Sequence, residues 1–147
     1  MLTPDRIHNA KIIFSPLNWG MGHVSRSLPI LEQLLRQNNV ITVFCSAPQE
    51  AIYASYFNNL HFIRHDSYSF SFSNEGFKLT RFIRKLPILI KQHVKERNRI
   101  NQYLRTNPTD YVISDQRYGF RGKSGCSIFI THQCTLPLPW YLAFGQC

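Results

Sequence analysis

The sequence predicts an α/β fold, a single domain built around a parallel β-sheet of at least five strands. The chain has 147 residues, about the length of one domain. Its composition is 44% hydrophobic and 14% aromatic, which is typical of a globular protein and argues against a disordered one. Short apolar runs alternate with segments of helical periodicity, the pattern of strands joined by helical crossovers.

The first half of the chain alternates strand and helix and ends on a third strand. The run "KIIF" opens a buried strand, and four leucines between residues 28 and 35 recur at helical spacing. The segment "VITVFCS" is β-branched and apolar, as strands are, and Pro48 suits the first turn of a helix. The predicted strands cover residues 11–17, 40–46 and 60–65, and the predicted helices cover residues 25–37 and 48–57.

The second half begins with the serine-rich stretch "DSYSFSFSNEG", which we expect to be irregular although its residues alternate. A long basic helix is predicted over residues 77–106, broken or kinked near Pro87. Two more strands follow, over residues 111–115 and 127–131. Because ten residues are few for a parallel crossover, residues 116–125 should form a tight loop with room for one helical turn.

Composition also limits where the protein is expected. No apolar run reaches the ~20 residues that a membrane span needs. The opening "MLTPDRIHNAK" lacks the apolar core of a signal peptide, so a cytoplasmic location is expected. The cysteines at positions 45, 126, 134 and 147 form no C-x-x-C pair, and we predict no metal site. Cys45 falls in a predicted strand and Cys126 lies at the start of another, and reduced, buried thiols are expected at both positions.

The net charge of +9 is concentrated in one segment. Between Lys78 and Arg105 lie nine basic residues and one acid, Glu96. Such a stripe indicates a polyanionic partner, either an anionic membrane surface or a nucleic acid. The alternative is an ordinary helix whose basic face is solvated.

Three polar clusters follow predicted strands, at residues 18–25, 115–121 and 131–133. Ligands of open α/β sheets bind beyond the carboxyl ends of the strands. Gly20 and Gly22 precede a helix start, where backbone N–H groups and the helix dipole favour an anion. The loop lacks the third glycine of a dinucleotide fingerprint and the G-K-[ST] of a P-loop. The predicted phosphate- or acceptor-binding residues are Asn18, Gly20, Met21, Gly22, Ser25, Arg117, Thr131, His132 and Gln133.

His23 and Asp115 are the candidate catalytic residues. The dipole at a helix N-terminus disfavours an imidazolium there, which keeps His23 available as a neutral base. Such a base beside an anion-binding loop can deprotonate a substrate hydroxyl. Asp115 ends another strand and is placed to orient the imidazole. The structural alternatives are a satisfied loop histidine and an aspartate that caps a turn.

The stretch "GMGHVSRSLPILEQL" after the first strand resembles the opening of GT-B glycosyltransferases. It is similar in particular to the MurG-like group of family 28, whose cell-wall member adds N-acetylglucosamine to a lipid-linked muramoyl peptide. "DYVISDQRYGF" and "SIFITHQ" resemble later strand ends of that group, and the resemblance covers about residues 11–138. The loops "NWGMGH" and "SDQRYGF" depart from the glycine-richer loops of the cell-wall enzyme, which leaves the acceptor open.

The resemblance implies a Rossmann-like domain that binds the acceptor in an inverting glycosyltransferase. It implies a nucleotide-sugar donor, a UDP-sugar first, a glycan or lipid-linked acceptor, and no other cofactor. His23 would match the family's base, Asp115 its partner acid, and Gly20 and Gly22 the phosphate-facing loop. GT-B enzymes have a second domain that holds most donor contacts, and this chain ends at Cys147. We therefore expect residues 1–147 to be the N-terminal domain, without a donor-binding domain and inactive alone.

A lipid-linked acceptor would give the basic segment a role, because apolar residues between positions 82 and 90 are interleaved with its cations. The protein would then be peripheral on the inner face of the cell membrane. The predicted membrane-binding residues are Arg81, Arg84, Lys85 and Lys91. Two other classes of function stay open: a basic nucleic-acid-binding α/β module, and an inactive remnant of the fold.

Overall fold

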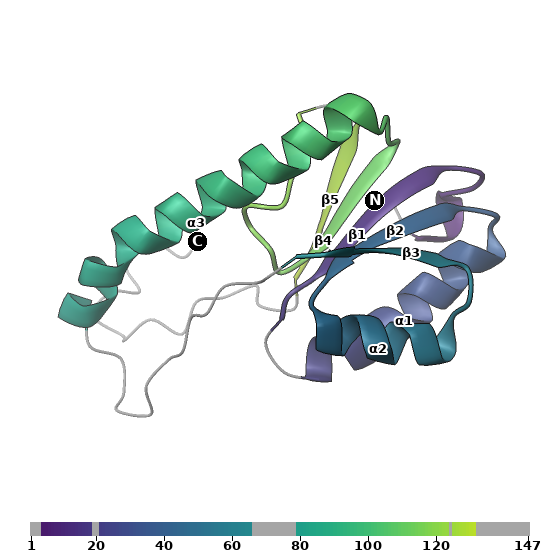
Figure 1. Ribbon diagram of the computed structural model, residues 1–147, viewed down its shortest axis with the longest axis horizontal. Coiled ribbons are helices and arrows are strands. Elements are labelled where there is room, and N and C mark those ends of the chain that lie inside the picture. Colours follow the sequence, from purple (N-terminus) through teal and green to yellow (C-terminus); the bar gives the residue numbers. More distant parts are fainter. Residues whose placement is uncertain (1–3, 19–20, 66–78, 124, 132–147) are drawn as a thin grey trace, which may run out of the picture.

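A parallel five-stranded sheet forms the centre of the domain, as predicted. The computed structural model describes residues 4–18, 21–65, 79–123 and 125–131, of which residues 4, 79–86 and 89 are described by their backbone alone. The strands are β1 (Lys11–Pro16), β2 (Val40–Cys45), β3 (Leu60–Arg64), β4 (Tyr111–Asp115) and β5 (Cys126–Ile130). Their order is β3-β2-β1-β4-β5, and all neighbours pair in parallel (Figure 1). This is the strand order of a Rossmann-like domain, which switches direction between β1 and β4.

Three helices cover the two faces of the sheet (Figure 1). Helices α1 (Met21–Arg36) and α2 (Ala47–Tyr56) lie on one face, and α3 (Leu79–Thr106) lies on the other. A short 3-10 helix, η1 (Pro4–Arg6), precedes β1. None of the helices in these ranges combines the length and the apolar character needed to cross a membrane.

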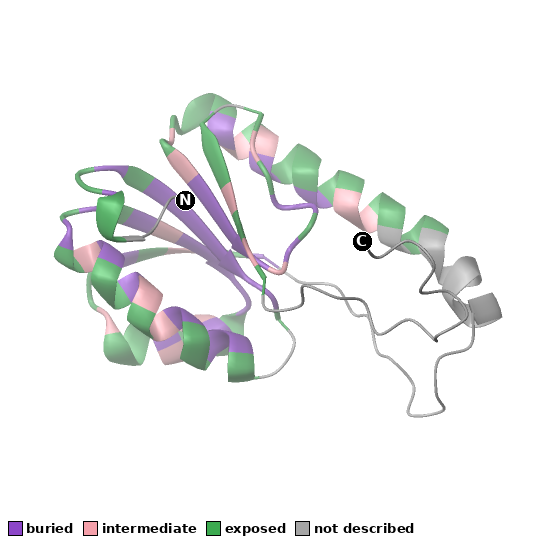
Figure 2. Ribbon diagram, turned by 180° about the vertical axis from the view of Figure 1, so that it is seen from behind, coloured by how far each residue is buried: buried purple, intermediate pink, exposed green. Residues whose placement is uncertain are grey.

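The alternation of side chains along the strands divides the core into two layers. Ile12 and Phe14 of β1 pack toward α1 in the larger cluster, with Ile113 of β4. Ile13 of β1 points the other way and packs with Ile100 of α3 in the second cluster. The central strands are buried along most of their length (Figure 2). Asp115 shares its face with Ile113, so the same alternation directs its carboxylate toward α1.

The elements differ from the predicted boundaries mainly at the helices. Helix α1 begins at Met21 rather than residue 25, so the end of the glycine loop already belongs to the helix. Helix α3 is continuous through Pro87, so the break that was one of the two predicted effects of this proline is absent. The C-terminal half of α3 packs on the sheet through residues such as Ile100 and Leu104. Its N-terminal half extends past the sheet (Figures 1 and 2). The serine-rich stretch after residue 65 lies outside the described residues.

The short connection between β4 and β5 is irregular, as expected, with a turn at Tyr118 and Gly119. Phe120 from this loop is 2% exposed and packs in the cluster beneath α3. This connection therefore contributes an aromatic side chain to the core where a crossover helix would otherwise pack. The loop is also tied to α3, since the backbone N–H of Lys123 donates to Asn101 Oδ1 (2.9 Å).

Gly125 ends this connection at a position where any residue with a Cβ would be strained. Its φ is +81°, and a Cβ there would lie 2.8 Å from the carbonyl oxygen of Thr109. Both features place the backbone close enough for Cys126 N–H to donate to the carbonyl oxygen of Asp110 (2.9 Å).

We predict that Gly125→Ala destabilises the fold by about 1–3 kcal/mol, because it adds positive-φ strain to a clash with backbone atoms. Urea unfolding of the variant checks this. Gly22→Ala is the matched control, since no described atom lies within 4 Å of a Cβ at that position. It should be neutral or stabilising by up to about 1 kcal/mol. Equal losses in the two variants would contradict the prediction.

Candidate functional site

The candidate site lies where β1 and β4 end, at the switch point of the sheet. His23 stands in the first turn of α1, which follows β1 after a short loop, and Asp115 is the last residue of β4. The strands pair in register at this edge, with Pro16 opposite Asp115. Residues that are 92 positions apart in the sequence therefore meet at the carboxyl end of the sheet.

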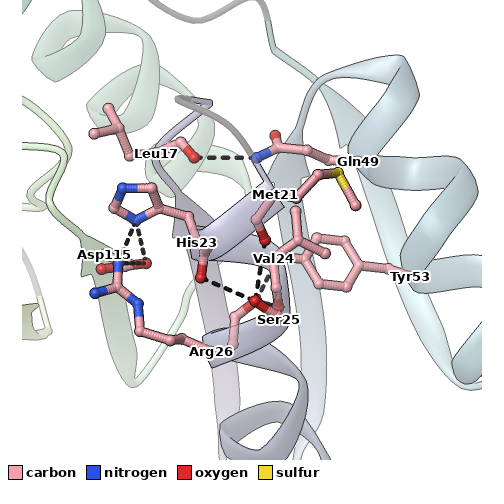
Figure 3. Close-up of polar contacts among 11 residues, drawn as sticks. Leu17, Met21, His23, Val24, Ser25, Arg26, Gln49, Tyr53 and Asp115 are labelled. Atoms are coloured by element: carbon pink, nitrogen blue, oxygen red, sulfur yellow. Dashed lines mark hydrogen bonds and ion pairs between the residues drawn. The ribbon is translucent and has the colours of Figure 1, made fainter.

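The two candidate catalytic side chains are in direct contact (Figure 3). His23 Nδ1 and Asp115 Oδ2 are 2.8 Å apart, and the side chains are 9% and 6% exposed. The expected juxtaposition is therefore present. A carboxylate that accepts a hydrogen bond from Nδ1–H fixes the orientation of an imidazole and stabilises its protonated form.

Arg26, which the sequence reasoning missed, joins this pair from the next turn of α1 (Figure 3). One of its guanidinium nitrogens lies 2.8 Å from His23 Nδ1 and 3.7 Å from Asp115 Oδ2. Residues three apart lie on the same face of a helix, so the spacing in "HVSR" was a usable signal.

Polar contacts from α2 and its N-cap hold Leu17 and Asn18, the described residues between β1 and α1. Gln49 Nε2 donates to the carbonyl oxygen of Leu17 (3.1 Å), and Ser46 Oγ donates to Asn18 Oδ1 (3.2 Å). Behind the histidine, the hydroxyls of Ser27 and Tyr53 are 2.5 Å apart and connect α1 to α2. Burial raises the pKa of the Tyr53 hydroxyl well above its ordinary value, so this hydroxyl stays protonated.

The other predicted ligand-binding residues are placed differently from one another. Met21 and Gly22 are exposed at the start of α1. Ser25 is also exposed, and its hydroxyl donates to the carbonyl oxygens of Met21 and Gly22 (both 3.2 Å). Thr131 is exposed after β5. The predicted residues Gly20, His132 and Gln133 lie outside the described part of the chain.

Arg117 is not at the site, although it was expected to bind phosphate or acceptor. It is 1% exposed, and its guanidinium forms an ion pair with Glu96 of α3 and donates to Ser15 Oγ (2.9 Å). The preceding residue, Gln116, has a φ of +55°, which turns the chain after β4. As a result Asp115 faces α1, while Arg117 is buried on the side of α3.

The cysteine predictions are met at one of the two described positions. Cys45 is buried, and its burial raises the pKa of the thiol to about 12, so it is inert. Cys126 is exposed rather than buried, because β5 is an edge strand. Within the described residues no group of three or more His, Cys, Asp or Glu side chains is placed to hold a metal ion.

Comparison with known proteins does not identify a family. No family model and no curated protein matches the chain. Among solved structures the chain is similar to Glycyrrhiza uralensis UGT73P12 complexed with glycyrrhetinic acid 3-O-monoglucuronide, at 13% identity and a TM-score of 0.45. The match covers 72% of this chain and 24% of the other, so the chain spans about a quarter of that protein. This likeness is too weak to indicate a function.

His65 is a further buried histidine at this edge, next to the Arg117–Glu96 pair. It is 5% exposed, and its Nε2 lies 3.5 Å from Glu96 Oε1. Burial, assisted by the charges of Arg117 and Arg99, lowers the pKa of His65 below its ordinary value of 6.5, while Glu96 opposes the shift. His65 is therefore neutral in the folded protein near neutral pH.

We predict that the free energy of unfolding falls as the pH drops below about 6.5, because the unfolded chain then binds a proton that folded His65 resists. One proton contributes at most about 1.4 kcal/mol per pH unit. Urea unfolding at pH 7.5 and 5.5 measures this loss. His65→Phe should reduce it, since Phe44 and Phe120 already form an aromatic environment around the ring. An unchanged pH dependence in that variant would contradict the assignment.

Proposed function

We propose that this chain forms the acceptor-binding part of an inverting glycosyltransferase that uses a UDP-sugar donor. The observation that carries the proposal is the 2.8 Å contact between His23 and Asp115 at the switch point of the sheet. The family resemblance of the loop that contains His23 supports it. In the proposed enzyme a second Rossmann-like domain holds most of the nucleotide sugar.

The chemistry follows from which ring nitrogen contacts the carboxylate. With Nδ1–H donated to Asp115, Nε2 of His23 carries the lone pair and accepts the proton of an acceptor hydroxyl. The acceptor oxygen then bonds to the anomeric carbon on the face opposite the nucleotide. The bond from that carbon to the diphosphate oxygen breaks, and its electron pair leaves with the nucleoside diphosphate. Asp115 stabilises the imidazolium formed in this step.

The glycine loop is the proposed phosphate- or acceptor-facing surface. Gly22 lies in the first turn of α1, and a Cβ added there would meet no described atom from another part of the fold within 4 Å, which suits the approach of a ligand. Backbone N–H groups of a first helical turn bind anions. Asn18, Met21, Ser25 and Thr131 are exposed around the same edge and are proposed ligand contacts, together with Gly20, His132 and Gln133.

We predict that His23→Ala lowers kcat about 10²–10⁴-fold, the cost of a lost general base. Sugar transfer from UDP-sugars to hydroxyl acceptors would be measured with the chain alone and with a separately supplied donor-binding domain. The chain alone should show no transfer. Asp115→Asn should also reduce transfer, whereas His61→Ala should not, because His61 is exposed on β3 away from the site.

Two outcomes would contradict parts of this proposal. Transfer at the normal rate by His23→Ala would remove the histidine as the base. Transfer by the chain alone that His23→Ala abolishes would keep the base but remove the need for a donor-binding domain.

The projecting half of α3 is the proposed contact with an anionic membrane. Ile90 and Val94 are 55% and 52% exposed at i, i+4 spacing, next to the exposed pair Lys91 and Lys95 at the same spacing. Adjacent apolar and cationic stripes suit a lipid surface, because apolar groups insert while the cations meet headgroups. The exposed isoleucine and valine do not favour a nucleic acid as the partner. Arg81, Arg84 and Lys85 belong to the same helix.

We predict binding to vesicles that contain phosphatidylglycerol but not to pure phosphatidylcholine, with loss at 1 M salt, where the Debye length falls to ~3 Å. Cosedimentation measures it. Replacing Arg81, Arg84, Lys85 and Lys91 by Gln should weaken binding, since each basic residue near the bilayer contributes about 1 kcal/mol. Replacing the exposed residues Arg6, Lys11, Arg36 and Arg64 instead removes the same charge and should have little effect. Retention on RNA or DNA that outcompetes vesicles would favour the nucleic-acid alternative.

A further inference from the structure

A cavity of about 240 Å³ on the α1 side of the sheet reaches Asp115, the partner of His23. Its apolar walls are Phe14, Ile30 and Ile130. Its polar walls are Arg26, Ser27, Asp115 and Thr131. The cavity therefore connects an apolar pocket to one guanidinium and to the carboxylate of the pair.

Arg26 and Asp115 compete for the same nitrogen of His23. Both groups lie 2.8 Å from Nδ1, the carboxylate through Oδ2 and the guanidinium through a terminal nitrogen (Figure 3). A hydrogen bond to Asp115 requires a proton on Nδ1, because a carboxylate only accepts. A hydrogen bond from Arg26 requires a lone pair on Nδ1, because a guanidinium only donates.

The two hydrogen bonds consequently belong to two different tautomers of the neutral ring. With Asp115 as partner the proton is on Nδ1, and Nε2 has the lone pair that a base needs. With Arg26 as donor the proton is on Nε2, and that atom cannot accept a second one without first losing it. Arg26 thus opposes the tautomer that the proposed reaction uses.

We infer that an anionic ligand with an apolar body binds this cavity and draws Arg26 away from His23 Nδ1, which releases the catalytic tautomer. This inference rests on the proposed function for the role of His23, but not for the binding itself. The side chain of Arg26 is 43% exposed, so its guanidinium can turn from the ring toward a ligand. Arg26 is a positioning residue in this scheme, since it acts through His23.

The charge and size of the cavity define the ligand class. A guanidinium at the rim selects a phosphate or carboxylate group by charge-assisted hydrogen bonds. The apolar walls select a hydrocarbon or aromatic body. A cavity of ~150 Å³ is large enough for benzene, so 240 Å³ accepts one ring with its substituent. The acceptor of the proposed reaction is therefore expected to carry an oxyanion near the hydroxyl that reacts.

Nitrogen-15 NMR of the His23 ring tests the inference without any sugar transfer. At pH 8 the population of the Nδ1–H tautomer would be measured in the full chain, free and titrated with phenyl phosphate, benzoate or phenol. Phenyl phosphate should raise this population, and phenol should not. A response to phenyl phosphate but not to benzoate would show that the ligand carries a phosphate group. A response to both would show that either a phosphate or a carboxylate suffices.

Variants of the arginine separate positioning from folding. In the Arg26→Ala and Arg26→Gln variants, His23 should adopt the Nδ1–H tautomer even without ligand. The same variants should bind phenyl phosphate about tenfold or more weakly. Arg36→Ala, which removes an exposed arginine of the same helix, should leave both unchanged. The inference is overturned if phenyl phosphate does not bind, or if it binds without changing the tautomer. It is also overturned if the Arg26 variants respond as the unchanged protein does. A ligand-driven tautomer change without sugar transfer would instead reject the proposed function alone.

Discussion

The parallel pairing of β1 with β4 is the interaction on which the site depends. These strands are separated by about 95 positions of chain, yet Ser15 lies opposite Ser114 and Pro16 opposite Asp115. A shift of this register by one residue would turn Asp115 to the other face of the sheet, because side chains alternate along a strand. The contact with His23 would then be lost. The buried residues on both faces of the central strands hold the register, since a slip would expose them.

The turn after β4 gives one short segment two unrelated roles. Asp115 and Arg117 are two residues apart and would share a face if the strand continued. The positive φ of Gln116 ends the strand and sends the two side chains to opposite sides of the sheet. Asp115 contacts His23, and Arg117 forms an ion pair with Glu96 beneath α3. Removing one member of such a buried ion pair is costly, because the remaining charge is then buried without a partner and without water.

The strand positions, the parallel sheet and the meeting of His23 with Asp115 were predicted from the sequence, whereas the order of the strands and most of the remaining contacts were not. Apolar runs mark buried strands, and parallel strands place their carboxyl ends together, so the meeting of His23 and Asp115 followed from topology. Arg117 was misplaced because nothing in "SDQRYGF" shows that the chain reverses face at Gln116. Its partner Glu96 is 21 positions away in a segment that is otherwise basic. The start of α1 was set four residues too late, because the glycines there suggested a loop.

Helix α3 is long, and its N-terminal half projects past the sheet (Figure 1). With 28 residues it is about 42 Å long, and among its described side chains those that pack in the core belong to its second half. Among the described side chains of α3, the first one that is buried is Glu96, past the midpoint of the helix. That carboxylate bears on Arg117, two residues beyond Asp115. The projecting half of α3 is thus linked, through Glu96 and Arg117, to the segment that directly follows Asp115.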